Sequence, residues 1–470
     1  MRRKAGIAVG ACVVLVLAGA AGAAAWAYAG DDEGRPVGTW HEGPGIARTP
    51  VAAERPATGP LTSAAAPPAA TPASPGASAT TPGHTTNTTT PEPGTSRTPR
   101  PESASRPGRQ RVGELLPVRR LLNYLGGGAR RETFRYPGAS YVKLHFGRMA
   151  MVPGDYLTVS NTDGTESYRY DAPAALNPGA IDKWAMSITG DTAVLEVHRG
   201  TATPLGLDSL LGTLGVDVDR VARGFTRAEQ RTQPEEQLRA PGRTGQEESV
   251  CGADTSADAA CYRSADPVAY TKSKAIARLL INGTELCTGW RVGPQNRMLT
   301  NNHCFTTSAE AYDTEVWFNY QCAKCGGYDV FRPSKVWGDK VLATDRVYDY
   351  TLFTVDNFAS VQRFGFLLLD PSRPVKGQQL FVPQHPAGEP TRIAGSLGGR
   401  AGNCAVTDPA YDGYAPRSDV AYYCDTEGGS SGSPVLSRSS NKVVALHHFG
   451  GCPNSGVRAD LLAAELRRYL

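Results

Sequence analysis

The sequence predicts an all-β protein with more than one domain. Strand-like runs are short and are separated by turn residues, and the 470-residue chain contains 52 glycines and 35 prolines. This composition is typical of β-rich domains and linkers. A chain of this length can hold two or three domains, and each of them can bury a core of its own.

The charge of the chain is balanced. A formal net charge of +4 results from 49 basic and 45 acidic residues, without a basic run or an alternation of basic and aromatic residues. Nucleic acid is therefore not an expected partner.

The first thirty residues predict an export signal or a membrane anchor. The basic start, 1–4, precedes an uncharged apolar run, 5–29, which ends in small residues as a secretory signal does. The run also exceeds the roughly 20 residues that span a bilayer, so a retained anchor stays open. We expect a secreted protein, or one attached to a membrane or cell wall through its N-terminus, with the rest of the chain outside the cell in either case.

Three segments of different composition follow. Residues 31–111 are rich in Pro, Thr, Ser, Ala and Gly; such a segment buries too little surface to fold, so a disordered linker is expected. Residues 132–200 carry short strand-like runs, with a hairpin signal at 161–164, and predict a small β-sandwich. This sandwich resembles the CUB-like modules of exported bacterial proteases, and a pro-region is the alternative. Residues 201–245 are expected to be a connector.

Residues 246–470 carry the predicted chemistry, and their end, 459–470, predicts a helix with Leu462 and Leu466 on one face. Covalent hydrolysis of an amide needs a nucleophile, a base, a group that orients the base, and donors for the oxyanion. The segment 427–435, Glu-Gly-Gly-Ser-Ser-Gly-Ser-Pro-Val, allows a tight turn that exposes a hydroxyl. Comparison with Gly-x-Ser-Gly-x-Pro assigns Ser431 as the nucleophile, and the N–H groups of Gly429 and Ser431 as the oxyanion hole.

His303 and Asp349 supply the remaining groups. His303 precedes Cys304, and histidine suits the base because its ordinary pKa lies near the working pH. Asp349 begins the apolar run 349–353, where its carboxylate can accept the imidazole N–H. The order His303, Asp349, Ser431 predicts a catalytic triad.

A competing motif lies in the same loop. Residues 428–432 also fit Gly-x-Ser-x-Gly, the nucleophile elbow of α/β-hydrolases, with Ser430 as the nucleophile. That fold places its Asp and His after the serine, on further strand–helix units, and only 38 residues follow Gly432. The elbow is therefore disfavoured.

On these motifs, residues 251–470 resemble the bacterial trypsin-like serine endopeptidases, with the lysyl endopeptidase branch nearest. The matching segments are 286–289, 300–304, 318–321, 349–352 and 426–434, with the early cysteines Cys251 and Cys261. The resemblance implies a chymotrypsin-like double β-barrel with the triad between the barrels, and a protein or peptide substrate. No cofactor or metal is expected. Ser430 replaces the aspartate that pairs with the freed N-terminus in trypsin-type zymogens, so activation must differ, and Asn301 and Asn302 stand where small residues are usual.

Nine cysteines outside the apolar N-terminal run predict a disulfide framework with one thiol left over. The resemblance implies the pairs Cys287–Cys304 and Cys251–Cys452, and it pairs Cys261 with Cys322 or Cys325. We take Cys325, which leaves Cys404–Cys424 as the fourth pair.

Two acids and one histidine bear on the residue that precedes the cleaved bond (P1). Asp425 lies six residues before Ser431, where trypsin-type sites carry their acid, and Asp460 lies near where the lysyl branch keeps its acid. A buried carboxylate favours a Lys or Arg substrate residue. Thr426, His448 and Gly450 instead resemble the glutamyl endopeptidases, in which a histidine receives an acidic side chain. We favour a basic P1, and an acidic P1 stays open, as does a plain surface or helix-capping role for both acids.

The predicted function is an exported serine endopeptidase that acts through an acyl-enzyme. The rival is a catalytically inactive, protease-like surface binding protein. Because residues up to about 243 lie between the export signal and the catalytic domain, a further hypothesis is that they inhibit the protease or assist its folding.

Overall fold

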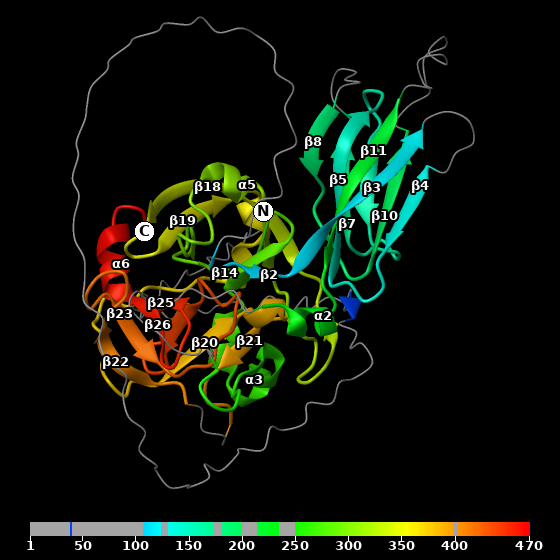
Figure 1. The fold of residues 1–470 in the computed structure, drawn as a ribbon. Helices are drawn as coiled ribbons and strands as arrows, with labels where there is room; N and C mark the ends of the chain where they lie inside the picture. Colours follow the sequence, from blue (N-terminus) through cyan, green and yellow to red (C-terminus); the bar gives the residue numbers. More distant parts are fainter. Residues whose placement is uncertain are drawn as a thin grey trace, which may run out of the picture.

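The computed structural model describes residues 107–123, 130–172, 180–199, 214–234, 250–398 and 403–470, together with the backbone of strand β1 (Gly38–Thr39). The chain folds into a β-sandwich, two β-barrels and a C-terminal helix (Figure 1). The predicted all-β, chymotrypsin-like class is confirmed. The predicted export signal or anchor lies outside the described residues, and within those residues no helix is long and apolar enough to cross a membrane.

The sandwich contains two sheets whose inward side chains form one core. The first sheet has the order β4 (Arg131–Arg135), β10 (Thr192–His198), β6 (Tyr156–Ser160), β7 (Ser167–Asp171). The second has the order β3 (Gly113–Asn123), β11 (Gly215–Gly224), β5 (Tyr141–Ala150), β8 (Ala180–Trp184), and β9 (Ile188–Thr189) also pairs with β5. The predicted hairpin is confirmed as the antiparallel pair of β6 and β7. Along β6, Leu157 and Val159 alternate into the core while their neighbours are partly exposed, as the two-residue period of a strand requires.

Two of the predicted boundaries are wrong. The expected connector, 201–245, contains β11, which lies between β3 and β5 because Val216, Val218 and Val221 enter the sandwich core. It also contains helix α2 (Arg227–Thr232). The expected linker, 31–111, contains β1 and also β2 (Gln110–Arg111), which pairs with the first barrel. The chain is thus paired with the first barrel at residues 110–111, before the sandwich begins.

The first barrel closes because β13 pairs with both β16 and β14. Its strands follow the order β13 (Ile276–Ile281), β16 (Thr314–Phe318), β18 (Ser334–Asp345), β19 (Tyr350–Val355), β15 (Met298–Thr300), β14 (Glu285–Arg291). β15 pairs with the end of β14, at Trp290 and Arg291, whereas β2 pairs with its beginning, at Glu285 and Leu286. The same edge of β14 thus pairs with β15 at one end and with β2 at the other.

The second barrel follows the first. Its sheet has the order β12 (Ala257–Asp258), β21 (Arg392–Ala394), β20 (Leu380–Gln384), β24 (Pro434–Ser437), β25 (Val443–Phe449), β26 (Asn454–Arg458), β23 (Asp419–Tyr422), β22 (Val406–Tyr411). Helix α6 (Ala459–Leu466) buries Leu462 and Leu466 as predicted, but it ends four residues before the chain does. Short elements complete the domain: α3 (Ala259–Ala265), α4 (Pro267–Ser273), α5 (Ser308–Tyr312), β17 (Asp329–Val330), η1 (Phe358–Ser360), η2 (Gln362–Phe364) and η3 (Pro386–Gly388).

The sandwich is joined to the first barrel by buried charges. Glu315 of β16 accepts from Lys143 of β5 at 2.8 Å, and it also accepts from the backbone N–H of Ser187 at 3.0 Å. Lys335 of β18 pairs with Glu166 of the sandwich at 2.8 Å, and all four charged side chains are almost completely buried. We call these two ion pairs the sandwich contact.

Candidate active site

The three predicted catalytic side chains come from both barrels. His303 follows β15 and Asp349 precedes β19 in the first barrel, whereas Ser431 precedes β24 in the second. The carboxylate of Asp349 binds His303 twice: Oδ2 lies 2.9 Å from Nδ1, and Oδ1 accepts the backbone N–H at 3.0 Å. Because Nδ1 is the donor to the carboxylate, Nε2 is the ring nitrogen left to act as a base.

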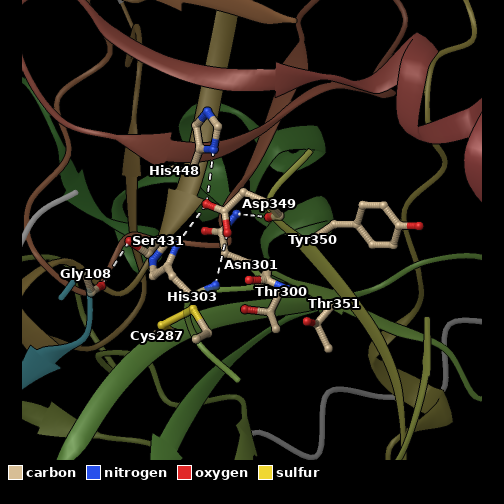
Figure 2. A network of polar contacts seen from close by, with 12 residues as sticks. Gly108, Cys287, Thr300, Asn301, His303, Asp349, Tyr350, Thr351, Ser431 and His448 are labelled. Carbon is tan, nitrogen blue, oxygen red and sulfur yellow. Dashed lines mark hydrogen bonds and ion pairs between the residues drawn. A yellow bond between two sulfur atoms is a disulfide. The ribbon is translucent and has the colours of Figure 1, made fainter. Parts of the chain in front are cut away.

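Two links bring Ser431 to His303. The backbone N–H of Thr288 donates to the carbonyl of Ser431 at 2.8 Å. Its neighbour Cys287 is bonded to Cys304, the residue after His303. Figure 2 shows Ser431, His303 and Asp349 near one another, with the contacts that join His303 to Asp349.

The backbone at Asp349 is in the left-handed region, with φ of 41°, where Asp is tolerated better than most residues. Asn301, completely buried, donates from Nδ2 to the carbonyl of Asp349 at 2.8 Å. Asn301, which stands where small residues were expected, therefore fixes Asp349, the residue predicted to orient the base. The sequence did not indicate this role.

The loop around Ser431 requires two glycines, one on each side of the Ser430–Ser431 pair. Gly429 and Gly432 have φ of 93° and 87°, and an added Cβ at Gly432 would collide with the carbonyl of Thr288. The carbonyl of Gly428 accepts from Ala387 at 2.7 Å, and that of Ser430 accepts from Ser433 at 2.9 Å. In a trans peptide the N–H points opposite to the C=O, so the N–H groups of Gly429 and Ser431 point away from these partners. An oxyanion hole needs such free donors.

Ser430, the nucleophile of the rejected elbow motif, is completely buried. Its Oγ accepts the N–H of Glu427 at 3.2 Å, inside the loop. The side chain is thus used for local structure.

A second histidine shares the triad carboxylate. His448 of β25 lies with Nδ1 3.1 Å from Asp349 Oδ2 (Figure 2). Its Nε2 lies 2.7 Å from Asp419 Oδ2. Burial alone would lower the pKa of His448, but the carboxylates of Asp419 and Asp349 outweigh it and raise the pKa to about 9. Burial likewise opposes ionisation of Asp349, yet His303 and His448 hold the pKa of this carboxyl well below its usual range. His448 is therefore an imidazolium at neutral pH.

This position corrects the assignment of His448 to substrate binding. Both of its ring nitrogens are used by carboxylates, and its side chain is completely buried, so it cannot receive a substrate side chain. Asp460 is corrected too: Arg458 donates to both of its carboxylate oxygens at the start of α6. Its charge is balanced within that turn.

Asp425 and Thr426 lie in the segment that leads to Ser431, and both are buried. Oδ2 of Asp425 accepts from the N–H and the hydroxyl of Thr255. Its Oδ1, and Oγ1 of Thr426, have no hydrogen-bond partner among the described residues. Such buried, unpartnered oxygens are uncommon and suit a place that a ligand fills. Gly450 follows β25 and is half-buried.

The described residues contain four disulfides: Cys251–Cys452, Cys261–Cys325, Cys287–Cys304 and Cys404–Cys424. Cys325, rather than Cys322, is thus the partner of Cys261, and Cys322 is a buried free thiol. Cys287, Cys304 and His303 have metal-ligand residue types and lie close together. Their two sulfurs are bonded to each other, so they offer no thiolate to an ion.

Ser431 has a contact that the sequence did not predict. Its Oγ donates to the carbonyl of Gly108, from the N-terminal region, at 3.3 Å (Figure 2). Nε2 of His303 is buried and has no hydrogen-bond partner among the described residues. The hydroxyl proton is therefore directed to Gly108 instead of to the base.

Comparison with known proteins gives three findings. Residues 287–446 match the family model of the trypsin-like peptidase domain. The chain is 42% identical over 231 residues to secreted RxLR effector protein 73 of Plasmopara viticola, covering 47% of this chain and 56% of that protein. The chain thus spans little more than half the length of this curated relative.

Among solved structures, a Glu endopeptidase in complex with MPD is 20% identical with a TM-score of 0.34, covering 47% of this chain and 98% of that one. The Rv3671c protease from M. tuberculosis, in its active form, is 14% identical with a TM-score of 0.33, covering 49% and 93%.

Proposed function

We propose that this chain, a chymotrypsin-like serine endopeptidase by its domain 287–446, is exported and hydrolyses peptide bonds through an acyl-enzyme. Ser431 is the nucleophile, His303 the base and Asp349 the group that orients the base. The observation that carries the proposal is the state of His303. Its Nδ1 is held by Asp349, while Nε2 is buried without a partner among the described residues, and Ser431 lies next to His303 in Figure 2.

The reaction uses these groups in two halves. Oγ of Ser431 attacks the substrate carbonyl carbon as Nε2 of His303 takes the hydroxyl proton, and Asp349 stabilises the imidazolium. The N–H groups of Gly429 and Ser431 donate to the oxyanion. His303 then gives the proton to the leaving amine, which departs from the acyl-enzyme. Water attacks the ester by the same route and frees Ser431.

We favour a basic P1, as the resemblance to the lysyl endopeptidase branch implies. Support comes from Asp425, whose buried Oδ1 has no partner among the described residues. A cationic side chain would satisfy that oxygen, whereas an acidic one would be repelled. The acidic alternative relied on His448, which is paired with two carboxylates.

Export is supported by two observations. Four disulfides in one domain are typical of oxidising compartments. The curated relative is named as a secreted effector. We also propose that the N-terminus attaches the protein to a membrane or cell wall, and that the sandwich is a CUB-like module.

Labelling with a fluorophosphonate tests the activity. We expect the secreted wild type to be labelled and Ser431→Ala to remain unlabelled, with peptide hydrolysis reduced about 10⁴-fold or more. Ser430→Ala is the matched control, because it removes the neighbouring hydroxyl. A mixed peptide library digested by the wild type reports the P1 preference. Lack of labelling of all three proteins, and also of Arg109→Ala, would favour the inactive binding protein.

A further inference from the structure

Residues 108–111 run through the active site, from a turn at Gly108 into the short strand β2. The carbonyl of Gly108 accepts from Ser431 Oγ. Two residues later, Gln110 and Arg111 pair antiparallel with Leu286 and Glu285 at the beginning of β14. An extended segment that adds to the edge of a sheet is a common way for a protein to bind a peptide.

The direction of this segment identifies the side of the site that it occupies. In acyl transfer the carbonyl beside the nucleophile belongs to the acyl group, and residues after it belong to the leaving group. Since Gly108 lies at Ser431, Arg109 holds the place of the first leaving-group residue. The beginning of β14 is thus the edge on which leaving-group residues pair.

The side chain of Arg109 is held by two carboxylates. Its guanidinium lies 2.7 Å from Glu285 of β14 and 2.9 Å from Glu310 of α5, and Nε donates to the carbonyl of His303 at 3.4 Å. Arg109 is only 2% exposed. Glu310 is fixed by accepting the N–H of Thr306 at 3.1 Å. Without a cation, two largely buried carboxylates would face each other, which is unfavourable.

We propose that Glu285 and Glu310 form a subsite for a basic side chain directly after the cleaved bond, and that Arg109 fills it to keep the site closed. The inference rests on the proposed function and adds a substrate preference and a form of regulation to it. A guanidinium suits the subsite because it donates to both carboxylates at once.

The segment is bound as an inhibitor and not as a substrate. Gly108 has φ of 89°, a value that residues other than glycine rarely adopt. Ser431 donates to the carbonyl oxygen of Gly108 rather than to His303 Nε2, which has no partner among the described residues. The nucleophile therefore lacks its base while the segment is in place.

The sandwich tethers the inhibitory segment. Gln230 of α2 donates to the carbonyl of Arg111 at 3.0 Å, and the backbone of Val112 bonds to both Thr284 and Phe225. β3 of the sandwich begins at Gly113. A ligand tethered at one end competes at a high effective concentration, so a weak individual contact is enough to exclude substrate.

Peptides that differ in the first leaving-group residue test the subsite. We expect kcat/KM for Arg to exceed that for Ala by about tenfold or more, because two charge-assisted hydrogen bonds are gained. Glu285→Gln combined with Glu310→Gln should bring this ratio close to one. Glu132→Gln, a charge change on the sandwich, is the control and should keep the ratio. Equal cleavage of Arg and Ala peptides by the wild type would overturn the subsite while leaving the proteolytic function intact.

Release of the segment tests the regulation. The full chain with Arg109→Ala should cleave an Ala peptide about tenfold faster than the wild type, since the inhibitory segment loses its charged contacts. Arg109→Lys should remain close to the wild type, and Arg120→Ala, at an exposed arginine of the sandwich, is the control. A lower melting temperature of Arg109→Ala without faster cleavage would make Arg109 a structural ion pair and overturn the inhibition. Absence of cleavage and of fluorophosphonate labelling in every variant would instead refute the proposed function.

Discussion

The N-terminal region contacts the peptidase domain at the sandwich contact and at the active site, and the two contacts differ in how completely their buried polar groups are paired. In the sandwich contact, Glu315 and Glu166 each bind a lysine, and Glu315 also accepts from Ser187 and Trp317. At the active site, Arg109 is equally buried and doubly paired. Beside it, however, His303 keeps a ring nitrogen without a partner among the described residues.

This difference indicates that the sandwich contact is permanent, whereas residues 108–111 occupy a site that a substrate can also fill. The charges of the sandwich contact are satisfied within the chain, so opening that contact would leave buried ions without partners. The groups that hold the inhibitory segment would serve a substrate equally well: β14 offers backbone hydrogen bonds, Glu285 and Glu310 offer charge, and Ser431 offers a hydroxyl. We infer that the sandwich stays in place while residues 108–111 exchange with substrate.

The largest expected effect comes from breaking the sandwich contact. Glu315→Ala would leave Lys143 and the neighbouring Lys335 without this buried carboxylate. Breaking such a pair from one side costs about 3–5 kcal/mol, so the free energy of unfolding in urea should fall by that amount. Glu132→Ala, at a partly exposed pair with Arg120, is the control and should cost less than about 1 kcal/mol. An unchanged urea midpoint for Glu315→Ala would show that this contact does not anchor the sandwich.

A smaller effect is expected from alkaline pH, and it should be confined to the active site. His448 faces Asp349 and Asp419, with His447 beside it in β25 and the ring of Tyr414 at its edge. Its folded pKa of about 9 lies above the unfolded value of 6.5. The resulting stabilisation is fully present below pH 6.5 and is lost as the pH rises through 9, and it corresponds to about 3 kcal/mol.

His448→Asn should remove this alkaline loss from urea unfolding measured between pH 6.5 and 10. It should also lower kcat/KM, because the carboxylate of Asp349 loses one of the two histidines that bind it. His198→Asn in the sandwich is the control and should keep the wild-type profile. A variant whose pH profile matches that of the wild type would refute the charged state of His448.

The sequence predicted those features that depend on residues close together in the chain. The glycines around Ser431 and the hairpin at 161–164 each depend on a few neighbouring residues, whereas the pair Cys287–Cys304 was predicted from the resemblance. β11 was missed because Asp217, Asp219 and Arg220 interrupt its apolar residues, which gives the segment the composition of a connector.

The remaining site contacts join residues that are far apart in sequence. Gly108 and Ser431 are separated by 323 positions, and Arg109 and Glu310 by 201. His448 was read as a substrate contact because its motif resembles the glutamyl endopeptidases. Its actual role depends on Asp419, which lies on another strand of the barrel, and no spacing in the sequence indicates that pairing.

The smallest expected effect is in the reactivity of Cys322, which can report whether the two contacts open separately. Burial and the carboxylates of Asp258 and Glu389 raise the pKa of this thiol to about 12, and Arg227 of α2 lies nearby and opposes them. Because the thiolate is the reactive form, iodoacetamide should not modify the native wild type. Arg109→Ala should be equally resistant, since only the inhibitory segment is released, whereas Glu315→Ala should react measurably faster. Cys322→Ala gives the background of labelling, and fast labelling of Arg109→Ala would mean that the sandwich leaves together with the segment.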